Sequence, residues 1–346
     1  MNGNTSPLLR VSDLKVHFAR PKAGWFQPHE VVRAVDGVSF EIDRGKTLAI
    51  VGESGSGKTT TALAVMRLAP VTSGSMLLGA TDLGGLEGEA LRLARRRLQI
   101  IFQDPFSSLN PRQRAGDAVR APLDLMQSGR PAQRAARVDE LFAAVGLRPE
   151  QQRLFPHQFS GGQRQRINIA RALATNPELV VCDEPVSALD VAIRAQILNL
   201  LVRLQREFGL TYLFISHDMA VVEHICDEIA VMYLGQIVER APRRAFFAHP
   251  LHPYSVSLMS AVPTVGGGRA RAARRIRLVG DPPSPISPPP GCRFAGRCPV
   301  AIAACSEALP PLVEVASGHE VRCIRVEVRE GLARGPLTLP EAADTV

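Results

Sequence analysis

Short apolar runs separated by amphipathic segments dominate the first two-thirds of the chain. Four such runs predict buried strands, at residues 48–51, 98–102, 179–182 and 211–215. Helical patterns lie between them, including an amphipathic segment over residues 192–208. Strands that alternate with helices in this way predict an α/β fold with a mainly parallel sheet and crossover helices.

Other segments alternate apolar and polar positions and predict antiparallel strands. Residues 8–18 and 38–42 have this pattern, and the polar stretch 19–30 between them is typical of a hairpin loop. Residues 228–233 and 236–239 predict a second hairpin. A helical patch over residues 113–145 ends at Gly146, a C-cap signal. We therefore expect an antiparallel β layer and a helical subdomain beside the parallel sheet.

A glycine-rich stretch directly follows the first buried strand. Its spacing is G-x-x-x-x-G-K-[ST], the pattern of a phosphate-binding loop between a strand and a helix, here a helix over about residues 58–68. Backbone N–H groups and the helix dipole favour an anion there, Lys58 should reach the β- and γ-phosphates, and the Thr59 hydroxyl should bind Mg²⁺. The predicted nucleotide-binding residues are Gly52, Glu53, Ser54, Gly55, Ser56, Gly57, Lys58, Thr59 and Thr60.

Acidic residues end the third buried strand. Asp183 is placed to hold Mg²⁺, directly or through water, and Glu184 can polarise the water that attacks the γ-phosphate. His217 follows the fourth buried strand and could hold this water in line, although a histidine after a strand is often only structural. The pattern predicts hydrolysis of the bound nucleotide.

A second glycine-containing stretch opens another helical segment, which runs to about residue 174. It consists of Ser160, Gly161, Gly162 and Gln163. Glycines and a serine at a helix N-terminus again favour an anion. Because the chain already has one phosphate-binding loop, we interpret this stretch as contacting a nucleotide held by another subunit.

In their order along the chain, these motifs resemble those of an ABC-type ATPase. The motifs are the phosphate loop, Gln103, SGGQ at 160–163, VVCDE at 180–184, SALD at 187–190 and His217. The resemblance covers about residues 8–260. It implies the P-loop ATPase core of that family, with a mainly parallel sheet, an antiparallel β layer and a helical subdomain. It also implies two ATP molecules bound head-to-tail between two such subunits.

Matching single positions implies further roles. Gln103 resembles the loop glutamine that senses Mg²⁺ and touches membrane subunits, Asp190 the dimer-contacting acid, and His217 the switch histidine. Phe18 lies where the family has an aromatic residue stacked on adenine, with a core phenylalanine as the alternative. The resemblance thus implies catalytic roles for Glu184, His217 and Gln103, and Mg²⁺ contacts from Thr59, Gln103 and Asp183.

Additional segments resemble the dipeptide/oligopeptide permease branch of this family. They are AVDGVSFEI at 34–42, IFQDPFSSLNPR at 101–112, YLGQIVE at 233–239 and HPYSVSLMSAVP at 252–263, followed by a proline-rich arm and a cysteine-containing tail. This resemblance implies the energy-coupling ATPase subunit of an importer for di- or oligopeptides. Its partners would be a related but distinct ATPase chain, two membrane-spanning permease subunits and an external substrate-binding protein. Nickel, glutathione and other solutes are alternatives within the branch.

Four of the six cysteines lie near the C-terminus, at Cys292, Cys298, Cys305 and Cys323. Their spacing matches neither common zinc motifs nor ferredoxins, so it leaves an iron–sulfur cluster, a zinc site and free thiols open. Members of the permease branch with GCRFAGRCP and a distal cysteine can hold a [4Fe–4S] cluster, and the resemblance implies such a cluster here.

The length of 346 residues allows two domains. We expect an ABC nucleotide-binding domain at 1–262, with its helical subdomain at about 104–175, and a C-terminal regulatory or docking domain at 263–346 that carries the four cysteines. No run approaches the roughly 18 consecutive apolar residues of a membrane span, and the N-terminus lacks a signal-peptide pattern. We therefore expect a peripheral protein on the cytoplasmic side of the cell membrane.

The formal charge of +8 raises the alternative of a soluble ABC ATPase that acts on nucleic acid. Much of the excess lies in arginine-rich runs at 92–97 and 269–277, which solvated surfaces also explain. Such ATPases usually carry coiled-coil arms, zinc insertions or tandem cores, and no such insertion separates the motifs here. We therefore expect no nucleic-acid partner. A catalytically idle subunit is a third alternative, disfavoured by the intact set from Lys58 to His217.

Overall fold

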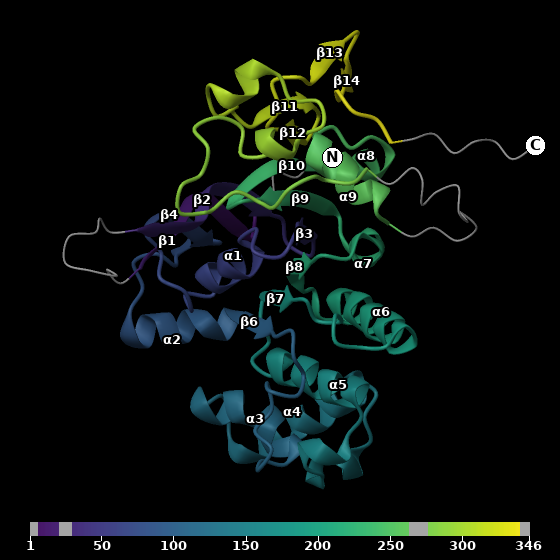
Figure 1. Ribbon diagram of the computed structural model, residues 1–346. Helices are drawn as coiled ribbons and strands as arrows, with labels where there is room; N and C mark the ends of the chain where they lie inside the picture. The colour runs from purple at the N-terminus through teal and green to yellow at the C-terminus, as the bar shows by residue number, and fades with distance from the viewer. Residues whose placement is uncertain (1–5, 21–29, 263–275, 340–346) are drawn as a thin grey trace, which may run out of the picture.

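The computed structural model describes residues 6–20, 30–262 and 276–339. Within these residues, the larger sheet has the strand order β11-β12-β10-β9-β3-β8-β7-β6 (Figure 1). Its strands are β3 (Thr47–Val51), β6 (Leu98–Ile101), β7 (Leu179–Asp183), β8 (Thr211–Ser216), β9 (Glu228–Tyr233), β10 (Gln236–Pro242), β11 (Val313–Ala316) and β12 (His319–Val321). The neighbours from β9 to β6 pair in parallel, as the sequence predicts.

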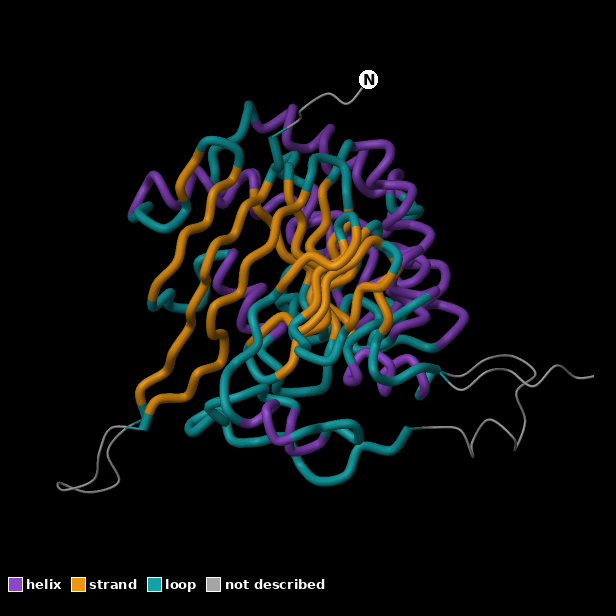
Figure 2. The backbone as a smooth tube through the Cα atoms, turned by 90° about the horizontal axis from the view of Figure 1, so that it is seen from above, coloured by secondary structure: helices purple, strands orange, loops and turns teal. Residues whose placement is uncertain are grey.

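The smaller sheet is the predicted antiparallel layer, with the order β2-β1-β4-β5. It contains β1 (Leu9–Ala19), β2 (Val31–Ile42), β4 (Ser73–Leu78) and β5 (Thr81–Asp82). A separate ribbon joins β13 (Glu327–Arg329) to β14 (Leu332–Arg334). The tube in Figure 2 shows the strands of both sheets together, with most helices on one side of them. The α/β fold class with an antiparallel layer is therefore confirmed.

The described part of the chain contains nine α-helices, besides the short 3-10 helices Pro149–Arg153, Pro156–Gln158, Ala295–Arg297 and Ala303–Ser306. The α-helices are α1 (Lys58–Val65), α2 (Gly88–Arg97), α3 (Ala115–Leu125), α4 (Pro131–Ala144), α5 (Gly161–Leu173), α6 (Val191–Phe208), α7 (Met219–Ile225), α8 (Arg243–Ala248) and α9 (Pro253–Ser260). Helices α3, α4 and α5 pack together at the end of the molecule opposite β11–β14 (Figure 1). Gly146 follows α4 with a φ of 73°, as expected of a C-cap glycine.

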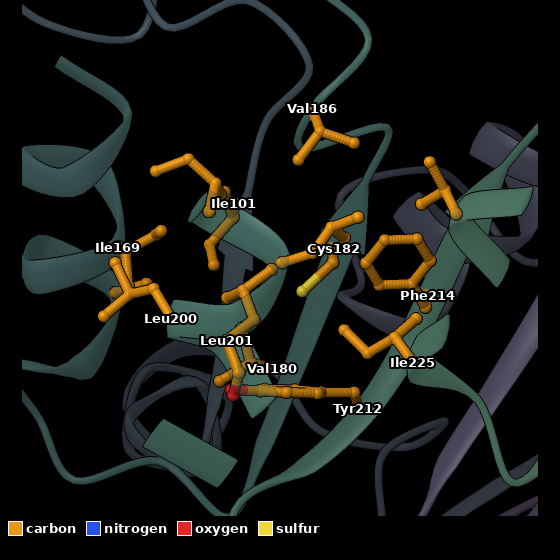
Figure 3. Packing of buried hydrophobic residues seen from close by; sticks show 14 of the residues in the cluster. Ile101, Ile169, Val180, Cys182, Val186, Leu200, Leu201, Tyr212, Phe214 and Ile225 are labelled. Atoms are coloured by element: carbon orange, nitrogen blue, oxygen red, sulfur yellow. The ribbon is translucent and has the colours of Figure 1, made fainter. Parts of the chain in front are cut away.

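Alternate residues of the parallel strands pack on opposite faces of the sheet. In β3, Ala49 and Val51 join a core that includes residues of α3–α7, whereas Leu48 and Ile50 face α1 and the antiparallel layer. Figure 3 shows the first core, where Cys182 and Phe214 lie between the strands and the helices. Both faces are covered, which explains why the parallel strands read as continuous apolar runs.

Several element boundaries differ from the sequence prediction, among them the end of β10, which extends to Pro242 rather than residue 239. The helix expected over residues 58–68 ends at Val65, because Arg67 adopts a left-handed conformation (φ 55°) and the N–H of Leu68 turns back to the carbonyl of Leu63 (2.8 Å). This C-cap motif usually contains glycine, and no glycine follows the helix here to indicate its end. Strand β2 begins at Val31 rather than residue 38, because the pairing with β1 continues past Asp36 and Gly37.

The C-terminal segment extends the main sheet. Strand β12 pairs antiparallel with β10, with Glu239 opposite Val321. The predicted domain boundary at 262/263 and most of the arginine-rich run at 269–277 lie outside the described residues, as does most of the loop at 19–30. Residues 281–290 form neither helix nor strand, and the carbonyl of Pro285 accepts a hydrogen bond from the N–H of Arg33 (3.0 Å).

A buried carboxylate ties this segment to the core. Glu239 in β10 is fully buried, and its side chain accepts hydrogen bonds from the N–H groups of Leu251 and His252, each at 2.8 Å. His319 Nε2 in β12 lies 2.8 Å from the same carboxylate. All three partners are themselves buried, so this side chain adds a buried polar contact to the backbone pairing of β12 with β10.

We expect Glu239→Ala to lower the free energy of unfolding by about 3–5 kcal/mol, because it leaves three buried donors without their acceptor. Urea denaturation of the full chain, followed by limited proteolysis of the C-terminal segment, measures the effect. Glu320→Ala is the matched control, since Glu320 is half-exposed and lies 3.8 Å from its partner Arg240. The free energy of unfolding of Glu320→Ala should fall by less than about 1 kcal/mol. Equal losses in the two variants would contradict this role of Glu239.

Candidate nucleotide-binding site and cysteine cluster

A cavity of ≈ 660 Å³ lies at the carboxyl ends of β3, β7 and β8. In an α/β sheet this is the edge where ligands usually bind. The cavity is lined by Ala34, Gly52, Glu53, Ser54, Gly55, Gly57, Lys58, Thr59, Thr60, Gln103, Glu184, His217 and Leu258. The structure thus brings the predicted phosphate loop together with residues from three distant motifs. Ser56 belongs to the loop but is buried and does not line the cavity.

The backbone of the phosphate loop requires glycine before α1. Gly57 has a φ of 105°, and a Cβ atom there would lie 2.3 Å from the carbonyl oxygen of Ala34 in β2. The conformation therefore excludes other residues both by strain and by contact. The loop leads directly into the N-terminus of α1, whose free N–H groups and dipole favour an anion.

The side chain of Lys58 lies buried inside the loop. Its Nζ donates hydrogen bonds to the carbonyl oxygens of Gly52 (2.9 Å) and Glu53 (2.8 Å). Burial lowers the pKa of Lys58, while the nearby Glu184, Asp183 and Glu53 raise it. The ammonium group is thus held in the cavity wall by loop carbonyls, at the place where the motif requires a cation for phosphate.

Oxygen donors suited to Mg²⁺ meet beside the loop. The hydroxyl of Thr59 donates to Asp183 Oδ1 (3.1 Å), and Asp183 is buried at the end of β7. Burial raises the pKa of this carboxyl, and the neighbouring Glu184 adds to the effect, so a bound cation would favour its ionised form. A hydroxyl and a carboxylate are ligands that Mg²⁺ accepts. The donor set therefore fits the metal.

Glu184 is the centre of the predicted catalytic group. Its Oε2 accepts a hydrogen bond from Gln103 Nε2 (3.0 Å), and its Oε1 lies 2.9 Å from His217 Nδ1. The backbone of Glu184 has a φ of 48°, a strained conformation of the kind that gathers at functional sites. The structure thus brings the three catalytic candidates into contact. The amide of Gln103 contacts Glu184 rather than Thr59 or Asp183, so its contact with Mg²⁺ stays a prediction.

The residues predicted to act across a subunit interface lie elsewhere. Ser160 caps α5, and none of the four residues Ser160, Gly161, Gly162 and Gln163 lines the cavity of their own chain. A Cβ atom on Gly162 would lie 2.5 Å from Ile193, so this glycine is needed for the close approach of α5 and α6. Asp190, at the N-terminus of α6, is exposed.

One predicted ligand contact has no counterpart in the cavity wall. Phe18 lies in β1, opposite Val32, with 37% of its surface exposed, and it is absent from the described lining of the cavity. Adenine stacking by Phe18 therefore stays a prediction.

Other contacts of the cavity were missed by the sequence analysis. Ala34 and Leu258 line it, and the hydroxyl of Tyr254 accepts a hydrogen bond from the N–H of Glu53 (2.8 Å). Tyr254 and Leu258 belong to α9, about 200 residues beyond the phosphate loop. The segment 252–263 was identified only by its resemblance to the dipeptide/oligopeptide permease branch. Its pattern of residues does not predict a contact with the phosphate loop.

The four C-terminal cysteines converge on one small cavity. Cys292, Cys298, Cys305 and Cys323 all line a space of ≈ 20 Å³, together with Phe294 and His252. All four are free thiols, and burial raises the pKa of Cys298 to about 11. In the described residues, no group of three or more cysteine, histidine or acidic side chains is arranged to hold a metal ion. The thiols are therefore neighbours without forming a coordination sphere.

The other two cysteines lie in the hydrophobic core. Cys182 lies in β7 and Cys226 follows α7, and both are buried in the core of the sheet. Burial raises the pKa of the Cys226 thiol to about 12 and that of Cys182 further still. Both thiols are therefore protonated and inert at neutral pH.

Comparisons with known proteins agree with this geometry. Residues 35–187 match the family model described as ABC transporter, and residues 238–305 match that described as oligopeptide/dipeptide transporter, C-terminal region. The chain is 50% identical to a probable peptide ABC transporter ATP-binding protein, y4tS of Sinorhizobium fredii, over 91% of this chain and 89% of the relative. It is 46% identical to the dipeptide transport ATP-binding protein DppF of Escherichia coli, over 95% and 97%.

Solved structures show the same fold. A dimeric ATP-binding cassette, MJ0796, in a post-hydrolysis state with ADP and Pi, superposes with a TM-score of 0.60 and 29% identity, covering 68% of this chain and 99% of that one. The protein cbiO1 of Clostridium perfringens, part of an ABC transporter complex, gives a TM-score of 0.60 at 26% identity, covering 70% and 91%.

Over the described residues, no helix has the length and apolar character to cross a bilayer. Three observations lead to one conclusion. They are the phosphate loop, the two acidic residues Asp183 and Glu184 at the end of β7, and the relatives that align along nearly the whole length of the chain. The chain is an ATPase of the ABC transporter family, in the branch whose members carry the oligopeptide/dipeptide transporter C-terminal region.

Proposed function

We propose that this chain drives the import of di- or oligopeptides by hydrolysing ATP on the cytoplasmic side of the membrane. The observation that carries the proposal is the contact of Glu184 with both Gln103 and His217 beside the phosphate loop. The peptide assignment is supported by the relatives, among them the oligopeptide transport ATP-binding protein AppF of Bacillus subtilis, 47% identical over 92% of this chain and 98% of that protein.

In the proposed hydrolysis, the phosphate loop holds the triphosphate through its N–H groups and Lys58. Thr59 and Asp183 would hold Mg²⁺, which supplies neutralisation of the phosphate charge. Glu184 accepts the proton of the attacking water or fixes its position, while His217 holds the Glu184 carboxylate from the exposed side. Gln103 reaches the other carboxylate oxygen and so connects the reacting site to the loop that follows β6.

The active unit would be a pair of ATPase subunits. Ser160, Gly161, Gly162 and Gln163 would contact the nucleotide held by the partner, and Asp190 would contact the partner near its site. Support comes from the position of Ser160 and Asp190 on the surface, away from the cavity of their own chain, and from the dimeric form of the solved cassette. We propose a related but distinct chain as the partner subunit.

The remaining partners would be two membrane-spanning permease subunits and an external protein that delivers the solute. This arrangement rests on the transport names of the relatives and on the matched C-terminal region. The solute itself would not touch this chain, so nickel and glutathione are alternative solutes for the same assembly. We propose no nucleic-acid partner.

We propose that the four C-terminal cysteines hold a [4Fe–4S] cluster, with zinc as the alternative. Four thiolates are the usual ligand set of such a cluster, and all four side chains line one cavity. Binding would deprotonate the thiols and draw them into a coordination sphere. Residues 263–346 would then form a docking or regulatory unit beside the nucleotide-binding domain at 1–262, whose helical subdomain spans about 104–175.

The import proposal predicts the outcome of replacing Glu184. In the source organism, deletion of this chain should abolish uptake of a radiolabelled peptide, and the wild-type chain should restore it. Glu184→Gln should not restore uptake, because its amide cannot accept the proton, and ATPase activity of the purified transporter should fall by about 10²- to 10⁴-fold. Glu207→Gln, at an exposed glutamate on α6, should behave as wild type. A deletion that spares peptide uptake but stops nickel or glutathione uptake would overturn the peptide assignment.

The cluster proposal predicts about four irons and four sulfides per chain after anaerobic purification, with a broad visible absorption band. Cys298→Ser should lose both the iron and the band. Cys226→Ala, which changes a buried cysteine outside the cavity, should keep them. About one zinc per chain would assign the alternative metal. Finding neither metal in protein with four reactive thiols would contradict the proposal.

A further inference from the structure

An arginine from the cysteine-bearing segment reaches into the phosphate loop. Arg297 lies between Cys292 and Cys298, and its guanidinium contacts Glu53 with two hydrogen bonds, Nη1 to Oε2 (2.7 Å) and Nη2 to Oε1 (3.2 Å). Glu53 is the second residue of the phosphate loop. The contact therefore joins two sites that the sequence separates by 244 residues.

This ion pair differs from an ordinary surface pair. Only 9% of the Arg297 side chain is exposed, and the guanidinium packs 5.9 Å from the ring centre of Tyr233. Paired hydrogen bonds between a guanidinium and a carboxylate fix both position and orientation, and burial reduces their screening by solvent. The geometry is thus suited to hold the Glu53 side chain in one place.

Glu53 is also held through its backbone. Its N–H donates to the hydroxyl of the buried Tyr254 (2.8 Å), and its carbonyl accepts a hydrogen bond from Lys58 Nζ (2.8 Å). Both contacts act on the loop that must receive the triphosphate. Movement of the Glu53 side chain would therefore disturb the N–H groups and the lysine that hold phosphate.

Charge gives a second reason for the contact. Glu53 lines the nucleotide cavity, and its charge acts on Lys58, the residue expected to reach the phosphates. An unpaired carboxylate there would repel an anionic ligand. An arginine side chain is charged at any physiological pH, so Arg297 always offers Glu53 a positive partner. The guanidinium thus offsets a negative charge in the wall of an anion site.

The same contact leads back to the four cysteines. Phe294, which lines the cysteine cavity, packs edge-on against Tyr233 (5.2 Å between ring centres) and at a tilt against Tyr254 (5.3 Å). Tyr233 contacts Arg297 and Tyr254 contacts Glu53. A packed aromatic cluster therefore lies between the cysteine cavity and the phosphate loop.

We propose that Arg297 is a positioning residue of the ATP site, which holds and neutralises Glu53 so that ATP affinity depends on the docked C-terminal segment. Its carboxylate partner, and not the nucleotide, is what the arginine touches. The proposal rests on ATP binding alone and is independent of the transported solute. It also holds whichever metal, if any, the cysteines bind.

The first test is the dissociation constant of MgATP on the full-length chain. Arg297→Ala should weaken binding by about five- to a hundredfold, the usual range of coupling between two sites. Arg297→Lys keeps the charge but loses the paired geometry, so it should recover part of the affinity. The matched control is Arg325→Ala, because Arg325 also lines the cysteine cavity but donates to the carbonyl of Val300 in its own segment. This control should bind MgATP as tightly as wild type.

A double variant separates neutralisation from general damage. In the Arg297→Ala background, Glu53→Gln removes the unpaired charge and should restore much of the lost affinity. In the assembled transporter, the KM for ATP should rise with the dissociation constant while kcat changes by less than about twofold, since Arg297 does not touch the reacting groups.

Several outcomes would overturn the proposal. One is an Arg297→Ala chain of lowered thermal stability but unchanged MgATP affinity. Another is a loss of the same size in Arg325→Ala, which would indicate general damage to the segment. If the double variant Arg297→Ala/Glu53→Gln binds MgATP more weakly than either single variant, the two losses of affinity add and the charge argument is wrong. An MgATP affinity that varies only with the metal content of each variant would also contradict the proposal. If Arg297→Ala does not fold, Arg297→Lys with wild-type affinity and KM would refute the paired contact.

Discussion

The parallel register of three strands is the constraint on which the rest of the structure depends. Val51 at the end of β3 pairs with Ser216 in β8, and Asp183 at the end of β7 pairs with Ile215. Parallel strands in this register end at one edge of the sheet. The phosphate loop, Glu184 and His217 therefore meet although they are far apart in sequence. A shift of one residue in any strand would turn its side chains to the opposite face and separate these groups.

Much of this arrangement could be predicted because it depends on local patterns. The apolar runs of β3, β7 and β8 reflect burial on both faces, and the phosphate loop is recognisable because only glycine fits at Gly57 beside the carbonyl of Ala34. The contact of Glu184 with His217 follows from strand order together with the family resemblance. The left-handed turn at Arg67 was missed, because its sequence contains no glycine to signal it.

The contacts with the C-terminal segment could not be predicted from the sequence. Tyr254 of α9 and Arg297 of the C-terminal segment both contact Glu53 because long-range packing places these two elements against the phosphate loop. No spacing rule relates residues that are more than 200 positions apart. Likewise, the spacing of the cysteines does not decide between an iron–sulfur cluster, a zinc site and free thiols. Only the fold shows that the four thiols line one cavity. Long-range packing, rather than local preference, decides these features.

The pairing of β12 with β10 also bears on how the chain behaves before it is complete. Until residues 319–321 arrive, β10 would present a row of unpaired backbone N–H and C=O groups along the margin of a large sheet. Such open margins recruit strands from other molecules and promote aggregation. The ribosome adds β12 about 80 residues after β10. During that interval the growing chain can aggregate through the unpaired edge of β10. The C-terminal segment thus covers the margin of β10 and leaves the short strand β11 as the edge of the sheet.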